Sequence, residues 1–226
     1  EFVADASHQL RTPLTALRLR LENLQSDATS PQQIAGLDRS IDEADRLARL
    51  VSDLLQLAQA DSSPKQAVCD LRQLAADRVD TWTAFGEQVD VDIELLADDH
   101  EMLVEAVPGS IEQILDNLID NAITASPAGG TVTVAISASS SVTQVVVRDQ
   151  GPGLTDDQKQ HAVERFWRAG SSTPGSGLGL AIVRSLVLGS RGSLELFDNE
   201  PSGLAVAVTF ASSVPAGSSR VRSRVS

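Results

Sequence analysis

Several residue types are scarce in this sequence, and each scarcity narrows what the protein can be. Aromatic residues make up 3% of the 226 residues and tyrosine is absent, so a packed core must consist mainly of Leu, Val, Ile and Ala. The single cysteine, Cys69, excludes an internal disulfide and suits a reducing compartment. Only 18 residues are basic against 31 acidic ones, and the net charge of −13 repels nucleic-acid phosphates. We therefore expect no nucleic-acid partner.

Long apolar runs are also missing. No stretch is apolar over the length that a membrane-spanning helix needs, and no signal peptide is visible, so we expect no membrane contact within this sequence. The sequence starts without Met, at Glu1, inside a helical pattern, and we expect it to be a piece of a longer protein. With 42% apolar residues it can still form one large core or two small ones.

Residues 1 to about 60 carry the periodicity of two helices. Leucines between Leu10 and Leu24 recur at alternating spacings of four and three, which is a heptad pattern. Turn residues and Pro31 interrupt it, and a second helix is predicted from there to about residue 60. Two neighbouring apolar stripes on the second helix make a face too wide for a two-helix contact, so we expect a homodimer in which two hairpins form a four-helix bundle. Packing of that face onto the chain's own second domain is the alternative.

The sequence after residue 61 mixes helical and strand patterns and predicts an α+β chain. Helices are predicted over residues 71–85, 111–125 and about 178–188. Strands are predicted over residues 89–95, 102–107, 131–137, 142–148, 194–197 and 204–210. The expected organisation is a helical hairpin (1–61), a linker (62–65), a globular domain (66–211) and a disordered Ser-, Gly- and Arg-rich tail (212–226).

The first helix carries a histidine beside its apolar seam. On the heptad count His8 is reachable by solvent and by a docking domain, and Thr12 lies one turn further on the same face. Pro13 predicts a kink directly after His8. An exposed histidine alone is ordinary, but the string from Phe2 to Leu14 resembles the H-box of sensor histidine kinases. In that family the histidine accepts the γ-phosphate of ATP, and a threonine four residues later orients a water that dephosphorylates the partner protein; His8 and Thr12 match these positions.

Gln9 departs from the family pattern, which usually has Glu or Asp directly after the histidine as a general base. An amide cannot take up a proton, but it can accept a hydrogen bond and so fix the tautomer of the imidazole. A phosphatase-biased protein, or a catalytically silent dimeric scaffold, is therefore an alternative.

Two asparagines lie at positions i and i+4 of the helix predicted over residues 111–125, so Asn117 and Asn121 share one face. As ordinary residues they would cap a helix or form a buried amide pair. The string over 113–122 resembles the N-box of the same family, whose asparagines contact the phosphates and hold Mg²⁺, with Asn121 as the matching metal ligand. Thr124 and Ala125 stand where the family often has a lysine and an aromatic residue, which leaves one phosphate contact and one base contact unsupplied.

An Asp-x-Gly-x-Gly string formed by Asp149, Gly151 and Gly153 follows a predicted strand. Alone it is a common turn. About thirty residues after the N-box-like helix, it resembles the G1 box, whose aspartate accepts a hydrogen bond from the adenine amino group while the glycines let the backbone approach the base.

Two further strings resemble the F-box and the G2 box. Residues 165–168 match the F-box, which borders a mobile lid over ATP; Arg168 is a candidate phosphate contact, whereas Phe166 and Trp167 could equally be core residues. The string over 175–183 opens a helix, where free N–H groups can bind an anion. A dinucleotide-binding motif is disfavoured because no strand directly precedes it. The residues that match the triphosphate-holding G2 box are Gly175, Gly177, Leu178 and Gly179.

The five strings occur in the order of the sensor histidine kinase family and cover nearly the whole chain. The resemblance implies a dimeric hairpin followed by an α/β sandwich of the kind shared with DNA gyrase ATPases, with ATP and Mg²⁺ as cofactors. It implies phosphorylation of His8 and transfer to an aspartate in the receiver domain of a response regulator, in the cytoplasmic portion of a bacterial membrane sensor. An ATP-driven clamp of the same superfamily is the alternative from another class.

Overall fold

The computed structural model describes residues 16–17, 19–26, 30, 32–41, 65–169 and 176–213. By its internal contacts the chain divides into two compact units, one made of residues 1–63 with 156–185 and the other of residues 64–155 with 186–226. Within the described stretches no helix combines the length and the apolar character that crossing a membrane requires. The helices predicted on either side of the turn before Pro31 are confirmed where the structure describes them, because residues 16–17, 19–26 and 32–41 are helical.

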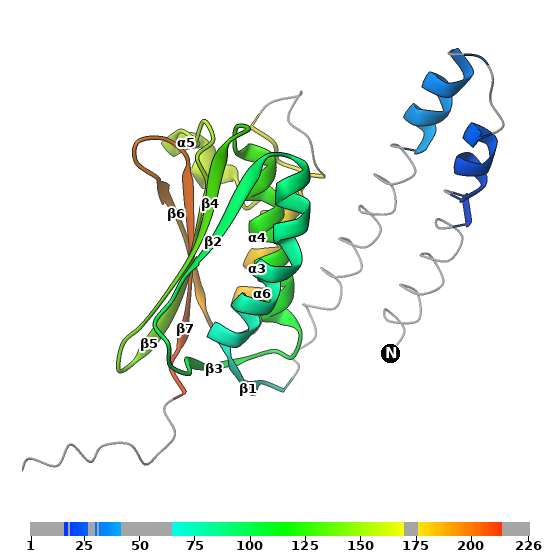
Figure 1. The fold of residues 1–226 in the computed structure, drawn as a ribbon. Coiled ribbons are helices and arrows are strands. Elements are labelled where there is room, and N and C mark those ends of the chain that lie inside the picture. Colours follow the sequence, from blue (N-terminus) through cyan, green and yellow to red (C-terminus); the bar gives the residue numbers. More distant parts are fainter. Residues whose placement is uncertain are drawn as a thin grey trace, which may run out of the picture. The chain divides into compact units, whose positions relative to one another are not determined.

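A five-stranded mixed sheet forms the centre of the second unit (Figure 1). Its strands follow the order β2-β4-β5-β7-β6, with β2 parallel to β4 and every other pair antiparallel. Their bounds are Val91–Leu96 for β2, Gly130–Ala138 for β4, Val142–Arg148 for β5, Ser193–Asp198 for β6 and Leu204–Ala211 for β7. The predicted mixed sheet is confirmed.

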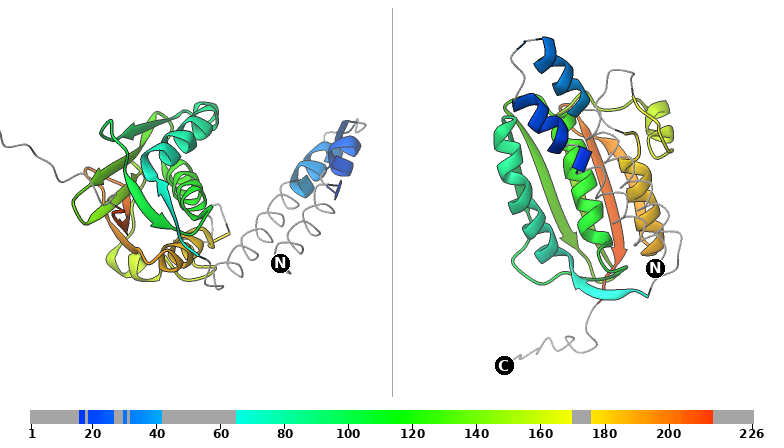
Figure 2. Two further views of the ribbon diagram at one scale, coloured as in Figure 1. Left: turned by 90° about the horizontal axis from the view of Figure 1, so that it is seen from below. Right: turned by 90° about the vertical axis from the view of Figure 1, so that its right-hand side faces the viewer.

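Two helices cover one face of this sheet and bury its alternating apolar side chains (Figures 1 and 2). Helix α3 spans Leu71–Gln88 and helix α4 spans Ser110–Ala125. In β4, Val132, Val134 and Ile136 are buried while Thr133 and Ala135 between them are half-exposed, as expected when only one face is covered. Each α4 position that its 3.6-residue period directs toward the sheet carries an apolar residue, and these are Ile111, Ile114, Leu115, Leu118, Ile119, Ala122 and Ile123.

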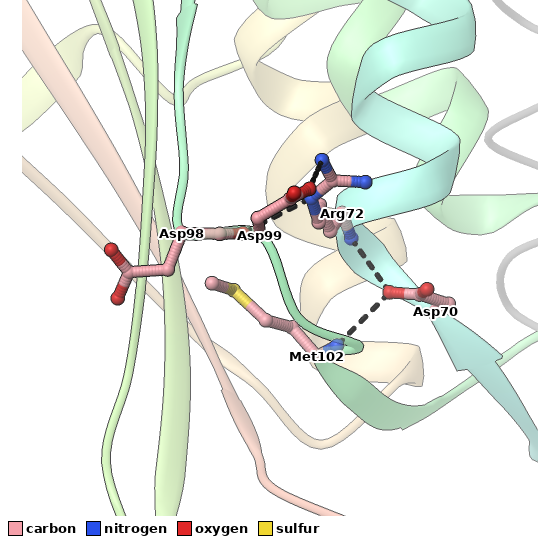
Figure 3. A network of polar contacts seen from close by, with 5 residues as sticks. All are labelled: Asp70, Arg72, Asp98, Asp99 and Met102. Carbon is pink, nitrogen blue, oxygen red and sulfur yellow. Dashed lines mark hydrogen bonds and ion pairs between the residues drawn. The ribbon is translucent and has the colours of Figure 1, made fainter.

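The start of α3 is held by a network of polar contacts (Figure 3). Asp70 caps the helix, since its Oδ1 accepts hydrogen bonds from the backbone N–H groups of Arg72 at 3.1 Å and Met102 at 3.0 Å. The Arg72 guanidinium in turn donates to the carbonyl of Asp98 and pairs with Asp99. The loop between β2 and the next strand, β3 (Leu103–Ala106), is therefore attached to the first turn of α3.

A second, two-stranded sheet pairs β1 (Ala67–Asp70) with β3 (Leu103–Ala106). After β7 the chain continues along this sheet: Ser212 forms a bridge with Val104, and the N–H of Ser213 donates to the carbonyl of Leu103 at 2.8 Å. The sequence predicted a disordered tail from residue 212 onward. Its first two residues, Ser212 and Ser213, are instead attached to β3. Residues 214–226 lie outside the described residues.

Two short elements were not predicted from the sequence, β1 and helix α5 (Asp156–His161). Helix α5 has no buried residue, so it shows no apolar periodicity to detect. The remaining helix, α6, spans Gly179–Gly189 within one residue of its predicted bounds.

Candidate functional site

The structure describes nine of the thirteen residues singled out for chemistry. His8, Gln9, Thr12 and Gly175 lie outside the described residues. Asn117, Asn121, Asp149, Gly151 and Gly153 belong to the unit with the five-stranded sheet, and Arg168, Gly177, Leu178 and Gly179 belong to the other unit.

Asp149 directly follows β5 and its carboxylate is held by backbone donors. Its Oδ1 accepts from the N–H of Gly151 at 2.8 Å and from the N–H of Leu204, the first residue of β7, at 3.1 Å. Its own N–H donates to the carbonyl of Leu204 at 3.0 Å, continuing the β5–β7 ladder by one residue. The side chain is only 6% exposed, so both its position and its direction are fixed.

Burial raises the pKa of Asp149 above the ordinary carboxyl value, and the two backbone hydrogen bonds oppose that shift. Both bonds go to Oδ1. Within the described part of the chain Oδ2 has no hydrogen-bond partner. Oδ2 is not sealed off, since it is not one of the fully buried side-chain atoms that lack a partner in the described residues. The arrangement suits a ligand that brings an N–H group to Oδ2.

The glycines after Asp149 allow very close backbone approaches. A Cβ at Gly151 would lie 2.5 Å from the carbonyl oxygen of Ala125, the last residue of α4. Gly153 has a φ of +69°, and a Cβ there would lie 2.9 Å from the carbonyl oxygen of Gly203. The Asp149 loop therefore touches the end of the asparagine-bearing helix, and the structure brings these two predicted motifs together.

Two residues that support Asp149 were missed by the sequence reasoning. Asn199 Nδ2 donates to the carbonyl oxygen of Asp149 at 2.8 Å. Gly203, with a φ of +121°, passes so close that a Cβ on it would lie 1.9 Å from the same oxygen. Both lie in the turn between β6 and β7, where a Pro-Ser-Gly string signals a turn but gives no sign of what the turn approaches.

Helix α4 presents its two asparagines away from its apolar face. Asn117 is half-buried, and its Nδ2 donates to the carbonyl oxygen of Gln113 one turn earlier at 2.8 Å. This bond directs the amide so that Oδ1 is left as an acceptor. Asn121 is exposed, and among the described residues its side chain has no partner. The prediction that a buried amide pair might form here is wrong, because Asn121 lies at the surface.

The two amide oxygens fit a hard divalent cation. Mg²⁺ binds oxygen ligands, keeps several waters and is commonly completed by substrate phosphates, so two side-chain oxygens on one helix face are a sufficient protein contribution. A metal ion would displace no hydrogen-bond partner from the side chain of Asn121 among the described residues. The amide nitrogen of Asn117 already donates to the carbonyl oxygen of Gln113, which leaves its amide oxygen for the metal. Asn121 is the better candidate ligand because it is the more accessible of the two.

In the other unit, the start of helix α6 is shaped by a close backbone contact. Gly177 has a φ of +70°, its carbonyl accepts from the N–H of Phe166 at 2.8 Å, and a Cβ on it would lie 2.7 Å from the carbonyl oxygen of Trp167. Leu178 is fully buried, and its N–H donates to Ser176 Oγ at 3.2 Å. The N–H groups from Gly179 onward begin α6 and, as at any helix start, have no acceptor within the first turn.

The aromatic residues preceding Gly177 differ from core residues. Phe166 is 58% exposed and has a φ of +65°, an uncommon conformation for an aromatic residue, so assignment of Phe166 to a core is wrong. Trp167 and Arg168 are half-buried. The backbone contact between Phe166 and Gly177 connects the string over 165–168 with the glycine-rich string, and the structure therefore brings these two motifs together as well.

Comparison with known proteins gives matches to two family models. Residues 1–63 match the family model of the His Kinase A (phospho-acceptor) domain. Residues 106–218 match the family model of the histidine kinase-, DNA gyrase B- and HSP90-like ATPase.

Curated relatives include sensor histidine kinase WalK of Bacillus subtilis strain 168, which is 33% identical over 220 residues, or 93% of this chain and 36% of WalK. Sensor protein QseC of Salmonella typhi is 36% identical over 82% of this chain and 41% of QseC. The chain thus spans well under half the length of these relatives. Among solved structures, full-length ShkA in complex with AMPPNP has a TM-score of 0.73 and 25% identity, covering 95% of this chain and 47% of ShkA.

Proposed function

The chain belongs to the sensor histidine kinase family, and we propose that it uses Mg-ATP to phosphorylate His8 and then passes the phosphoryl group to an aspartate of a response regulator. The observation that carries the proposal is the Asp149 carboxylate. One of its oxygens is held by two backbone N–H groups and the other has no donor among the described residues. A purine amino group supplies the missing donor.

The phosphate end of ATP is assigned to the asparagine face of α4 and to the start of α6. Asn121, with Asn117 beside it, would hold Mg²⁺, which neutralises charge on the phosphates when bound. Gly177 and Gly179 offer backbone N–H groups at a helix start, and such groups favour anions, whereas Leu178 is assigned to the phosphates by its match to the family motif. Gly175 and Arg168 are assigned to the same phosphates by resemblance to the family motifs.

Phosphoryl transfer depends on positioning and charge neutralisation more than on covalent help from the protein. In the first step the bond between the γ-phosphorus and the bridging oxygen breaks, ADP leaves with the electron pair, and a phosphorus–nitrogen bond forms to the imidazole of His8. The ring proton goes to solvent, because Gln9 can accept a hydrogen bond but not a proton. In the second step the phosphorus–nitrogen bond breaks as an aspartate oxygen attacks, and His8 regains a proton.

We further infer a homodimer through the hairpin of residues 1–61, from its two apolar stripes. Thr12 is assigned to positioning a water for dephosphorylation of the regulator, by its match to the family motif. A cytoplasmic location within a membrane sensor is inferred from the family alone.

The first experiment incubates the chain with γ-labelled ATP and compares it with His8→Gln. We expect labelling that is lost in the variant while nucleotide binding survives, and label that is released by acid, as phosphohistidine requires. Label retained in His8→Gln would refute the assignment of His8. Binding and hydrolysis of ATP without any labelled protein would favour the ATPase clamp, and binding without either reaction would favour the silent scaffold suggested by Gln9.

A second experiment tests the nucleotide site by calorimetry. Asn121→Ala is expected to lose Mg-dependent binding of ATP, because it removes an accessible amide oxygen without disturbing the buried face of α4. Gln88→Ala, which removes an exposed amide at the end of α3 and outside the motif strings, is the matched control and should bind as the unaltered chain does. Unchanged affinity in Asn121→Ala would remove this residue from the site.

A further inference from the structure

Asp116, the residue directly before Asn117, is held by two side chains of the neighbouring helix. Trp82 of α3 donates its indole N–H to Asp116 Oδ1 at 2.8 Å. Arg78, one turn earlier in α3, places Nη1 3.7 Å from Asp116 Oδ2. Helices α3 and α4 lie side by side on the sheet (Figure 2), and all of these residues belong to the same unit.

Of the two contacts, the indole hydrogen bond is the stronger. The Arg78 contact is too long for a hydrogen bond, and the side chains are 29% and 37% exposed, so solvent weakens the ion pair. The Trp82 bond has ideal length and joins a rigid donor to a carboxylate. The indole itself is held by an edge-to-face contact with Phe85, with ring centroids 5.6 Å apart. Trp82 therefore sets the position of Asp116.

The position of Asp116 bears on the direction of the asparagines. At 3.6 residues per turn, Asn117 and Asn121 lie about 100° and 140° around α4 from Asp116. The buried face of α4 consists of Ile, Leu and Ala, whose packing is not directional. A side-chain amide that lies some 6 Å from the axis of α4 would be displaced by about 1.5 Å if the helix rotated by about 15°. A misplacement of about 1 Å can already change a reaction rate 100-fold.

Two further contacts hold the ends of α4. Ser110 in the first turn shares a hydrogen bond of 3.1 Å with Ser190, both side chains being buried. The carbonyl of Ala125 at the last turn lies against Gly151. The Trp82–Asp116 bond is a directional contact between α3 and α4 at the middle of α4, next to Asn117.

We propose that Trp82 is a positioning residue for nucleotide binding: through its hydrogen bond to Asp116 it sets the rotation of α4 and with it the direction of Asn117 and Asn121. The inference rests on the proposed function, because it needs those asparagines to meet Mg-ATP. Residues that orient a ligand-binding group from behind commonly contribute about tenfold or more to affinity. Loss of the indole donor should therefore appear as weaker binding by a folded protein.

The test compares Trp82→Phe with two other variants of the full chain. Trp82→Phe removes the N–H donor and keeps an aromatic ring against Phe85. Phe85→Leu is the matched control, because it removes the ring contact and leaves the indole N–H in place; Phe85 is 44% exposed. Asp116→Asn retains an oxygen that can accept from the indole while losing the charge that attracts Arg78. Affinity is measured by calorimetry with Mg-AMPPNP, and unfolding by urea titration of the same samples.

We expect Trp82→Phe to weaken Mg-AMPPNP binding about tenfold, and Asp116→Asn and Phe85→Leu to stay within about twofold of the unaltered chain. Equal affinity in Trp82→Phe would overturn the positioning role while leaving the proposed function in place. The positioning role would also be overturned if Phe85→Leu weakened binding as much as Trp82→Phe, since both effects would then reflect a general loss of packing between the helices. An unaltered chain that fails to bind Mg-AMPPNP would overturn the proposed function, and the positioning role with it.

Discussion

Replacing Gly203 with alanine tests the support of Asp149 by a residue fifty-four positions away in the sequence. A Cβ at Gly203 would lie 1.9 Å from the carbonyl oxygen of Asp149 and 2.7 Å from its carbonyl carbon. Both are backbone atoms held by the β5–β7 ladder and by Asn199, so they cannot turn aside as a flexible side chain can. Gly203→Ala must therefore displace the turn between β6 and β7 from Asp149.

Two contributions make up the expected cost. A positive φ costs an alanine about 1–2 kcal/mol, and overpacking against fixed atoms costs about 1–3 kcal/mol. The sum is about 2–5 kcal/mol, a large part of the roughly 5–15 kcal/mol that stabilises a typical domain. Gly129 separates the two contributions, because it has a φ of +75° and nothing within 4 Å of a Cβ. Gly129→Ala should cost only the first contribution, about 1–2 kcal/mol.

Urea unfolding of the two variants, followed by circular dichroism, measures both values. The expected result is a midpoint for Gly203→Ala well below that of Gly129→Ala, with similar slopes against urea concentration. If Gly203→Ala were no less stable than Gly129→Ala, the close approach between Gly203 and Asp149 could not exist in the folded protein. The same result would remove the reason for regarding the β6–β7 turn as part of the Asp149 site.

Two further predictions concern buried polar groups. Burial raises the pKa of Asp149, so the folded protein holds the proton of this carboxyl group more tightly than the unfolded chain does. The free energy of unfolding therefore falls as pH rises from the ordinary carboxyl pKa of about 3.9 through the raised native value. Asp149→Asn removes that decrease, so urea titrations at successive pH values should show its stability improving relative to the unaltered chain across this window; a constant difference would contradict the shift. Ser190→Ala leaves the N–H of Val107 without its acceptor at 3.1 Å and should cost about 1–3 kcal/mol, against at most about 0.5 kcal/mol for the exposed Ser193→Ala; equal costs would contradict the buried bond.

The sequence predicted the elements whose side-chain pattern is local and strong. Helix α4 has an apolar residue at each buried position, and β4 alternates cleanly between buried and half-exposed residues. Strand β1 has only four residues and its Val68 is 56% exposed, so its existence depends on pairing with β3 more than thirty residues later. Local pattern contains no information about such a partner.

The same division applies to the site. Asp149 and its glycines were found because one short string contains them. Asn199 and Gly203 were not found, because their role is a contact across fifty residues that only the β5–β7 and β6–β7 pairings create. Trp82 was missed for a related reason, since a tryptophan on an amphipathic helix is indistinguishable in sequence from an ordinary core residue. The exposure of Phe166 depends on its positive φ, which nothing in the sequence indicates for a phenylalanine.

The position of β7 has a consequence for how the protein matures on the ribosome. Of the strands in the described residues it is synthesised after all the others, yet it lies between β5 and β6. Until Leu204–Ala211 emerges, β6 has no neighbour and the edge of β5 is bare, and Asp149 lacks one of its two N–H donors. Until β7 has been synthesised, the nascent domain therefore keeps open strand edges that favour wrong pairing, and its sheet closes only afterwards.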